Sequence, residues 1–229
     1  MRIFALTGAG VSAESGLGTF RDKDGLWTKY DLEEVATPEG YSRDPQKVHD
    51  FYNARRANAA GAEPNAAHHA LARLARSTNH DLTLVTQNVD WLHEMAGTEA
   101  IHMHGRLDRA TCHTCRETWD APAVMSPDDA CPFCENTDTR PDIVWFGEMP
   151  YEMETIYHTL AGADLFVAIG TSGQVYPAAG LVAEAKAAGA HAIEFNLDPS
   201  DVSTAFDEHI LGRATLTVPD WVGRVLGQA

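Results

Sequence analysis

The chain has four cysteines, all within one short segment, and their spacing restricts what that segment can form. Cys112, Cys115, Cys131 and Cys134 make two Cys-x2-Cys pairs with fifteen residues between them. This spacing is typical of a tetrahedral zinc site with four thiolate ligands. Because sulfur would fill every coordination position, we predict one structural zinc that orders a segment too small to hold its own core. Four free thiols, or His113 as a competing ligand, are the alternatives.

Outside this segment, short apolar stretches alternate with helical patterns. We expect strands at residues 2–7, 82–86, 100–104, 143–146, 165–169 and 191–196, and helices at 45–60, 64–76, 90–95, 152–161, 178–188 and 219–226. This alternation is typical of an α/β fold with a doubly wound, Rossmann-like parallel sheet. We therefore predict one domain over 1–229, with a core from 1–35, 79–107 and 142–229, a helical insertion at 36–78 and a zinc-binding module at 108–141.

The composition is strongly acidic. The 229 residues carry a formal net charge of -16, which would repel a phosphate backbone, so no direct nucleic-acid binding is expected even from a zinc ribbon. The charge favours a basic partner only weakly, and solubility alone would explain it. No apolar run approaches the roughly 20 residues of a membrane span, and the first residues do not resemble a signal peptide. We therefore expect a cytoplasmic protein without a membrane partner.

A glycine turn follows the first predicted strand. The run Gly8-Ala9-Gly10-Val11-Ser12-Ala13 matches a turn that lets backbone N–H groups approach a pyrophosphate, although a plain strand-to-helix turn would read the same way. An ordinary dehydrogenase would continue with a second strand that ends in an acidic residue. The next stretch, residues 15–22, reads instead as a loop. The later strand ends, Gly170-Thr171-Ser172 and Asn196-Leu197-Asp198, are better placed for a nucleotide, with Asp198 on the ribose hydroxyls.

Further polar residues follow the other strands. Thr86-Gln87-Asn88-Val89-Asp90 ends a strand with hydrogen-bonding side chains, at the edge of a doubly wound sheet where ligands bind; helix capping by Asp90 is the alternative. His104, next to Gly105, is a candidate general base because an imidazole titrates near neutral pH. His102 would share its face in a strand and is interpreted as an ordinary polar residue.

Together these motifs resemble the sirtuins, in that family's order and over nearly the whole chain. The segments that carry the resemblance are Gly8 to Gly16, Thr19-Phe20-Arg21, Thr86 to Asp90, His104-Gly105, the four cysteines, Gly170-Thr171-Ser172 and Asn196-Leu197-Asp198. Arg140-Pro141, Phe146-Gly147-Glu148 and Val175 to Gly180 are similar to the CobB-type, class III branch. The resemblance implies an NAD-dependent deacylase of protein lysines, in which NAD is a co-substrate, with acylated proteins or peptides as partners.

The resemblance also implies a chemistry. The acyl oxygen attacks the nicotinamide ribose, nicotinamide leaves, and His104 acts as the base that lets the 2′-hydroxyl attack the acyl carbon. Free lysine and O-acyl-ADP-ribose are the products. The implied cofactor-binding residues are Gly8, Ala9, Gly10, Glu14, Thr19, Phe20, Arg21, Trp27, Gln87, Asn88, Val89, Asp90, Gly170, Thr171, Ser172, Asn196, Leu197, Asp198 and Ala214. The implied substrate-binding residues are Ala36, Tyr52, Arg55, Val144, Phe146, Gly147, Glu148, Val175 and Tyr176.

Tyr52 and Arg55 stand three apart on a predicted helix, and so share a face. A phenol and a guanidinium together can bind a carboxylate, and the spacing resembles the Y-x-x-R motif of a malonyl and succinyl pocket. Ala36 would leave room beside it. Without the resemblance, this pair would read as a solvated helix face. The resemblance therefore favours removal of succinyl and malonyl groups, with acetyl as a further substrate.

Two residues depart from the family pattern. Gly18 stands where many members have Pro or Arg, and Trp91 where many have Gly; we expect neither to abolish activity. Three other functions remain open from the residues alone: mono-ADP-ribosyl transfer at the same NAD site, a dehydrogenase, and a zinc-bearing nucleotide sensor without catalysis.

Overall fold

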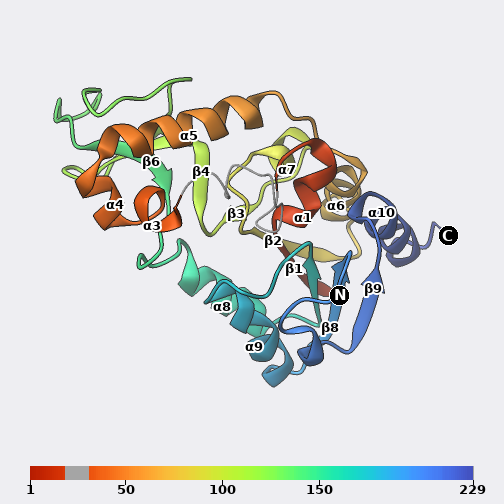
Figure 1. The fold of residues 1–229 in the computed structure, drawn as a ribbon. Helices are drawn as coiled ribbons and strands as arrows, with labels where there is room; N and C mark the ends of the chain where they lie inside the picture. The colour runs from red at the N-terminus through yellow and green to blue at the C-terminus, as the bar shows by residue number, and fades with distance from the viewer. Residues whose placement is uncertain (19–30, 229) are drawn as a thin grey trace.

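A six-stranded parallel sheet forms the centre of the molecule (Figure 1). The computed structural model describes residues 1–18 and 31–228. In spatial order β3-β2-β1-β7-β8-β9, the strands are β3 (Ile101–His102), β2 (Asp81–Thr86), β1 (Arg2–Thr7), β7 (Leu165–Ile169), β8 (His191–Asn196) and β9 (Glu208–Leu211). From β1, the chain adds β2 and β3 on one side; it then returns to the other side of β1 and adds β7, β8 and β9. The predicted doubly wound sheet is thus confirmed, with its switch point between β1 and β7.

Helices cover both faces of this sheet, because β1 and β7 are apolar on both sides. On one face, α6 (Ala66–Ala75) and α10 (Ala214–Val225) pack Leu71 and Val218 against Ile3. On the other, α8 (Met153–Ala161) and α9 (Leu181–Ala187) pack against Phe4 and Phe166. The sheet and these helices are called the large lobe below. Its short connecting elements are α1 (Ala9–Ser12), η1 (Ala13–Ser15), α7 (Leu92–Met95), η2 (Ala178–Gly180) and η3 (Ser203–Ala205).

A second, smaller layer stands beside the large lobe (Figure 1). Its antiparallel sheet has the order β5-β4-β6, from β5 (Thr118–Asp120), β4 (Gly105–Cys112) and β6 (Thr139–Ile143). It is covered by α3 (Leu32–Val35), α4 (Pro38–Arg43) and α5 (Pro45–Ala60). Phe51 and Tyr52 of α5 are buried with Leu107, Ile143 and Trp145, which fixes α5 on this sheet. These elements are called the small lobe.

Two elements differ from the sequence expectation. The strand expected at 143–146 in the parallel sheet is instead β6, which ends at Ile143 and belongs to the antiparallel sheet. The last helix begins at Ala214, not at Pro219, because burial of Val218 and Trp221 outweighs the hydrogen bond that an internal proline forfeits. Within the described residues, no helix has both the length and the apolar character that a bilayer crossing needs.

Candidate active site

The glycine turns after β1 and β7 meet at the switch point of the large sheet. The Gly10 N–H donates to the Gly170 carbonyl at 2.9 Å. A Cβ on Gly8 would lie 2.7 Å from the Gly170 oxygen, and one on Gly170, whose φ is +66°, would lie 2.5 Å from the Val11 nitrogen. The glycines are therefore required first for the close approach of the two turns. That approach places both turns at the crevice where doubly wound sheets bind nucleotides.

Asn88 and Asp90, which follow β2, are fixed by a buried hydrogen-bond network. The Ser12 hydroxyl donates to the Asp90 carboxylate at 3.1 Å and accepts from the Asn88 amide at 3.1 Å. The Leu92 N–H donates to the other Asp90 oxygen at 3.1 Å. Burial raises the pKa of Asp90 above its ordinary value, and these two donors to the carboxylate oppose the shift. The network holds two of the predicted cofactor residues in one orientation before any ligand binds.

Two buried histidines near this network, His68 and His93, were not recognised from the sequence; their ring centres lie 4.9 Å apart. His68 accepts from the Asn65 N–H through Nδ1, so its Nε2 carries the proton and faces the Ser12 hydroxyl at 3.4 Å. Burial lowers the pKa of His68 to about 3 and that of His93 to about 4, so both rings are neutral. The Asn-x-x-His capping box at the start of α6 is the sequence signal that could have identified His68 as a hydrogen-bonded residue in the first turn of this helix.

His104 has a defined tautomer. Its Nδ1 lies 3.2 Å from the Gln87 carbonyl oxygen, which can only accept, so Nδ1 carries the proton and Nε2 keeps its lone pair. Burial lowers the pKa of His104 from its ordinary value of 6.5, and the hydrogen bond to Gln87 opposes this only in part. A neutral imidazole with one free basic nitrogen results, which is the form that a general base needs at neutral pH.

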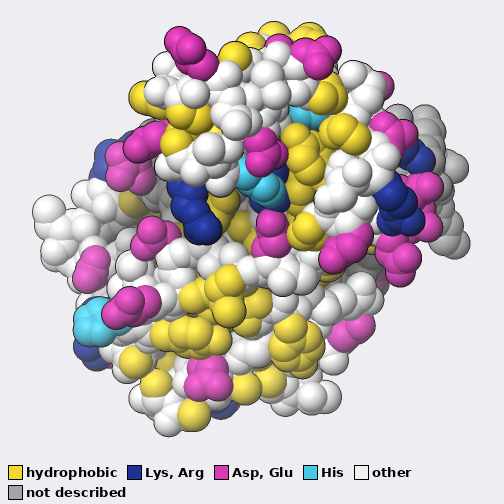
Figure 2. All heavy atoms as spheres, turned by 90° about the vertical axis from the view of Figure 1, so that its left-hand side faces the viewer, with side chains coloured by type: hydrophobic (Ala, Val, Ile, Leu, Met, Phe, Trp, Pro, Cys, Tyr) yellow, Lys and Arg dark blue, Asp and Glu magenta, His cyan; other side chains and the backbone are white. Residues whose placement is uncertain are grey.

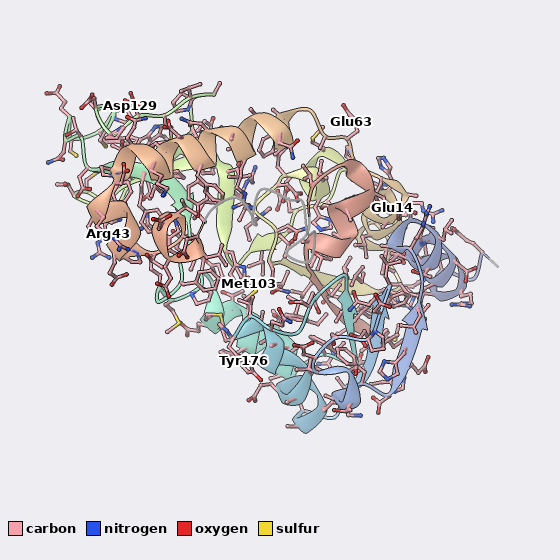
Figure 3. All side chains as sticks on the ribbon, in the orientation of Figure 1. Glu14, Arg43, Glu63, Met103, Asp129 and Tyr176 are labelled. Carbon is pink, nitrogen blue, oxygen red and sulfur yellow. The ribbon has the colours of Figure 1, made fainter. Side chains whose placement is uncertain are left out.

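The segment around His104 joins the two lobes. Figure 3 places Met103, the preceding residue, where the lobes meet. A glycine is required at position 105, where φ is +80°, because a Cβ there would lie 2.0 Å from the backbone carbonyl oxygen of Asp142. His102 closes β3, and its two ring nitrogens lie 3.1 Å from the Asn88 carbonyl and 3.0 Å from the Glu94 carboxylate. His102 is thus engaged in fixing the loop after β2, in keeping with its interpretation as an ordinary polar residue.

The predicted nucleotide residues of the later strands lie beside the switch point. Asn196 ends β8 and donates to the Thr171 carbonyl at 2.7 Å, while Leu197 and Asp198 are exposed beyond it. Glu14 lies beside α10 (Figure 3), where its carboxylate accepts from the Thr215 hydroxyl at 2.6 Å. That contact brings Glu14 and Ala214 together at the start of α10. Thr19, Phe20, Arg21 and Trp27 lie outside the described residues.

Tyr52 and Arg55 lie on the inner side of α5. The Tyr52 hydroxyl is buried and accepts from the Trp145 indole N–H at 3.0 Å. The Arg55 guanidinium is partly buried, with its carbon 5.7 Å from the Tyr52 ring centre. Burial lowers the pKa of Arg55, and the nearby Tyr52 and Asp90 oppose that shift. The Asp90 carboxylate after β2 thus contributes to the electrostatic environment of the Arg55 guanidinium.

Several of the predicted peptide-binding residues lie in the segment that follows β6, between the lobes. The Val144 N–H donates to the His104 carbonyl at 3.0 Å, and the Phe146 N–H donates to the Ala36 carbonyl at 2.9 Å. Gly147 takes φ +89° in the turn that follows. Phe146 is 45% exposed and Tyr176 is 72% exposed, so both offer apolar surface.

The Glu148 carboxylate is engaged within the protein. It lies 2.7 Å from the Arg140 guanidinium and accepts from the Trp145 N–H at 2.8 Å. The Arg140 guanidinium in turn stacks on the Trp145 ring at 3.7 Å. The Glu148 N–H also donates to the Trp145 carbonyl at 3.0 Å, so both the carboxylate and the N–H of Glu148 close the turn.

The four cysteines come together at the tip of β4 and β6. Their sulfur atoms all lie within 4.8 Å of one another, with 3.7 Å between Cys112 and Cys134 and 3.6 Å between Cys115 and Cys131. Four sulfurs at 2.3 Å from a tetrahedral zinc would be about 3.8 Å apart, so the geometry fits this ion. His113 is not part of this group of sulfur ligands; its Nδ1 lies 4.0 Å from an Asp138 carboxylate oxygen.

The face formed by both lobes is hollowed between them. Figure 2 shows cationic, acidic and histidine side chains gathered in this hollow, whereas apolar side chains cover much of the large lobe below it. A basic nitrogen, a buried carboxylate and two glycine turns thus converge at the carboxyl ends of a doubly wound sheet. Fold and site together define a nucleotide-binding α/β protein that carries a four-cysteine metal module.

Comparisons with known proteins agree with this class. The family model described as Sir2 family matches residues 8–177. An NAD-dependent protein deacylase of Caulobacter vibrioides is 58% identical, over 100% of this chain and 98% of that protein. A Sir2 homologue–NAD complex is 38% identical with a TM-score of 0.90, over 99% of this chain and 90% of that one. Sir2Af2 bound to a myristoylated histone peptide is 30% identical with a TM-score of 0.76, over 100% and 93% of the two chains. The chain belongs to the Sir2 family.

Proposed function

We propose that this protein removes acyl groups from protein lysines with NAD as co-substrate. The observation that carries the proposal is the position of His104, whose Nδ1 is held by the Gln87 carbonyl and whose Nε2 is left basic at the carboxyl ends of the sheet. The similarity to NAD-dependent deacylases over the whole chain supports it. NAD supplies the ADP-ribose unit that accepts the acyl group, with loss of nicotinamide.

His104 acts as the general base in this reaction. Its Nε2 takes a proton from a ribose hydroxyl, while Nδ1–H keeps its bond to Gln87 and holds the ring in place. The Gln87 side chain, Asn88 and Asp90 bind at the nicotinamide and its ribose. Because the Ser12 network already fixes Asn88 and Asp90, little ordering remains for the moment of binding.

The other predicted roles divide along the crevice. The N–H groups of Gly8, Gly10 and Gly170 donate to carbonyl groups of the protein, so these glycines act by letting the two turns approach closely. Other backbone N–H groups of the two turns bind the pyrophosphate, and Ser172, Asn196 and Asp198 bind the adenosine half. The resemblance also assigns Phe20 and Arg21, which lie outside the described residues, to the exclusion of water from the reacting groups. Backbone groups of Val144 to Glu148 and the Val175–Tyr176 loop bind the peptide as an added strand.

The cysteine module holds one structural zinc. Four sulfurs within 4.8 Å of one another leave no position for water or substrate on the ion. A site of reduced thiols suits a reducing compartment such as the cytoplasm. The zinc orders the tip of the small sheet on which α5 rests, and so supports the acyl pocket at a distance.

Tyr52 and Arg55 select acyl groups that end in a carboxylate. The Tyr52 oxygen accepts from Trp145, so its own hydroxyl hydrogen is available to a second acceptor. The Arg55 guanidinium adds a charge-assisted donor beside it, in an environment whose burial strengthens the interaction. Succinyl and malonyl groups supply such a carboxylate, whereas acetyl does not.

Replacing Arg55 by methionine should separate the acyl substrates. A charge-assisted hydrogen bond contributes about 1.5–3 kcal/mol, so desuccinylation should fall by roughly 10- to 150-fold in kcat/KM. Deacetylation should change by less than about threefold, because an acetyl group has no carboxylate to lose. Arg55→Lys, which keeps the charge but not the planar fork, should fall between the two. Equal losses on both substrates would remove Arg55 from the acyl pocket.

One assay tests the proposed activity as a whole. Peptides that carry acetyl-, malonyl- or succinyl-lysine are incubated with NAD, and nicotinamide, free-lysine peptide and O-acyl-ADP-ribose are measured by mass spectrometry. Stoichiometric formation of all three supports deacylation. ADP-ribose attached to the protein or peptide would instead support mono-ADP-ribosyl transfer, and reduced cofactor absorbing at 340 nm a dehydrogenase. Cofactor binding without nicotinamide release would support a nucleotide sensor.

A further inference from the structure

Glu194 is a fully buried carboxylate in the middle of β8, next to the adenosine end of the proposed cofactor site. It is 0% exposed. Three donors reach it: the Ser200 N–H at 3.0 Å, the Asn196 side-chain amide at 3.1 Å and His209 Nδ1 at 3.1 Å. Burial alone would raise the pKa of Glu194, but these hydrogen bonds lower it below its ordinary value, so the group stays ionised.

The partners of Asn196 fix which way its amide points. Asn196 Nδ2 contacts two oxygens that only accept, the Glu194 carboxylate at 3.1 Å and the Thr171 carbonyl at 2.7 Å. The nitrogen must therefore face these two groups, because the amide oxygen would be repelled there. Within the described part of the chain, no donor bonds to Asn196 Oδ1. The atom that Asn196 leaves for a ligand is thus an acceptor.

This acceptor lies at the nucleotide crevice. Thr171 follows Gly170, and its side chain lies beside the position of a Cβ on Gly8, so the Asn196 amide rests on the turn at the switch point. Asp198, two residues beyond, adds an exposed carboxylate. Arg213 follows Gly212, whose N–H donates to the Asn196 carbonyl, but Arg213 is ion-paired with Glu14 at 3.8 Å.

We propose that Glu194 is a specificity-determining residue that makes the ribose end of this site accept hydroxyl groups and reject a 2′-phosphate. A ribose hydroxyl donates to an amide oxygen, whereas a phosphate offers only acceptors and negative charge. In dinucleotide-binding folds the same distinction separates sites for NAD from sites for NADP, which use an acidic residue and an arginine respectively. Here Asp198 supplies one exposed carboxylate, and Glu194 adds a second, buried negative charge that contacts the Asn196 amide. The inference rests on the proposed function, in that Asn196 binds the adenosine half of the cofactor.

The test compares two ligands on the intact protein by calorimetry, ADP-ribose and 2′-phospho-ADP-ribose. The wild-type protein should bind ADP-ribose about 100-fold more tightly. Glu194→Gln keeps the size of the side chain and an oxygen for Asn196 and Ser200, while the new amide nitrogen replaces the carboxylate oxygen that faces His209 Nδ1. Removal of the charge alone should lower the preference about tenfold, through tighter binding of the phosphorylated ligand, with ADP-ribose affinity within about twofold.

The matched control is Glu208→Gln. Glu208 lies on the adjacent strand β9 but pairs with His191 at the opposite end of β8, so its charge is distant from Asn196. This variant should leave the preference within about twofold of the wild type. A purely structural role of Glu194 would weaken both ligands alike and keep their ratio. An unchanged ratio in Glu194→Gln, or a wild-type ratio near one, overturns the inference, whereas failure of the wild-type protein to bind ADP-ribose overturns the proposed nucleotide site itself.

Discussion

Replacement of His104 by alanine should reduce deacylation by about 10²- to 10⁴-fold, the range that a positioned general base contributes. The variant should still bind ADP-ribose within about threefold of the wild type, because within the described residues the imidazole is hydrogen-bonded to the Gln87 carbonyl and not to the glycine turns. The loss should therefore appear in kcat rather than in the dissociation constant of the cofactor. Single-turnover measurements of deacylated peptide, with ADP-ribose binding in parallel, separate these two quantities.

The control for this variant is His158→Ala, which removes an exposed imidazole from α8 and should leave turnover unchanged. The pH profile gives a second check. Because burial lowers the pKa of His104 below 6.5, its basic form persists through neutral pH, and activity should be lost only as the pH falls through that lowered value. Retained turnover in His104→Ala, or a profile that rises only above pH 6.5, would exclude His104 as the base.

Removal of the zinc should unfold the tip of the small lobe. Structural zinc sites in small peptides contribute about 10–16 kcal/mol of apparent binding free energy, and the segment between β4 and β6 has few other buried groups. Cys131→Ser, which removes one thiolate of the group, should lose the metal and lower the thermal midpoint. Because α5 packs on β4 and β6, activity on succinyl-lysine should fall with it.

The measurement is metal content by mass spectrometry of the native protein together with thermal unfolding. The wild-type protein should hold one zinc per chain, and the Cys131→Ser protein none. His113→Ala is the matched control: it lies inside the first cysteine pair but faces Asp138, so this variant should retain the metal. Zinc lost from His113→Ala but retained in Cys131→Ser would reverse the assignment of the ligands.

Local sequence signals predicted the elements whose causes are local. Asp44 and Pro45 begin α5 as expected, with the Asp44 carboxylate accepting from the Lys47 N–H at 3.0 Å. The apolar runs of β1 and β7 gave a buried parallel sheet for the same reason. The end of β6 and the start of α10 were misplaced, because packing against distant elements decides both.

The sequence predicted those parts of the candidate site that are local motifs, and it missed those parts that join distant segments of the chain. The glycine turn and the cysteine pairs were visible because each is a short motif that lies within one segment of the chain. The Ser12 network was missed, because it joins residues from three separate segments that only the fold brings together. The sequence also predicts Glu148 in the peptide site, but it did not reveal that the Glu148 carboxylate pairs with Arg140.

The sequence by itself therefore determined the kinds of groups this protein carries: a base, a carboxylate, glycine turns and four thiols, in the order of one family. Only the tertiary structure decided their states. The proton on Nδ1 of His104 depends on the Gln87 carbonyl, and the orientation of Asn196 depends on Glu194 and Thr171. A side chain's chemistry is written in its residue type, but its protonation and direction come from neighbours that meet only when the chain folds.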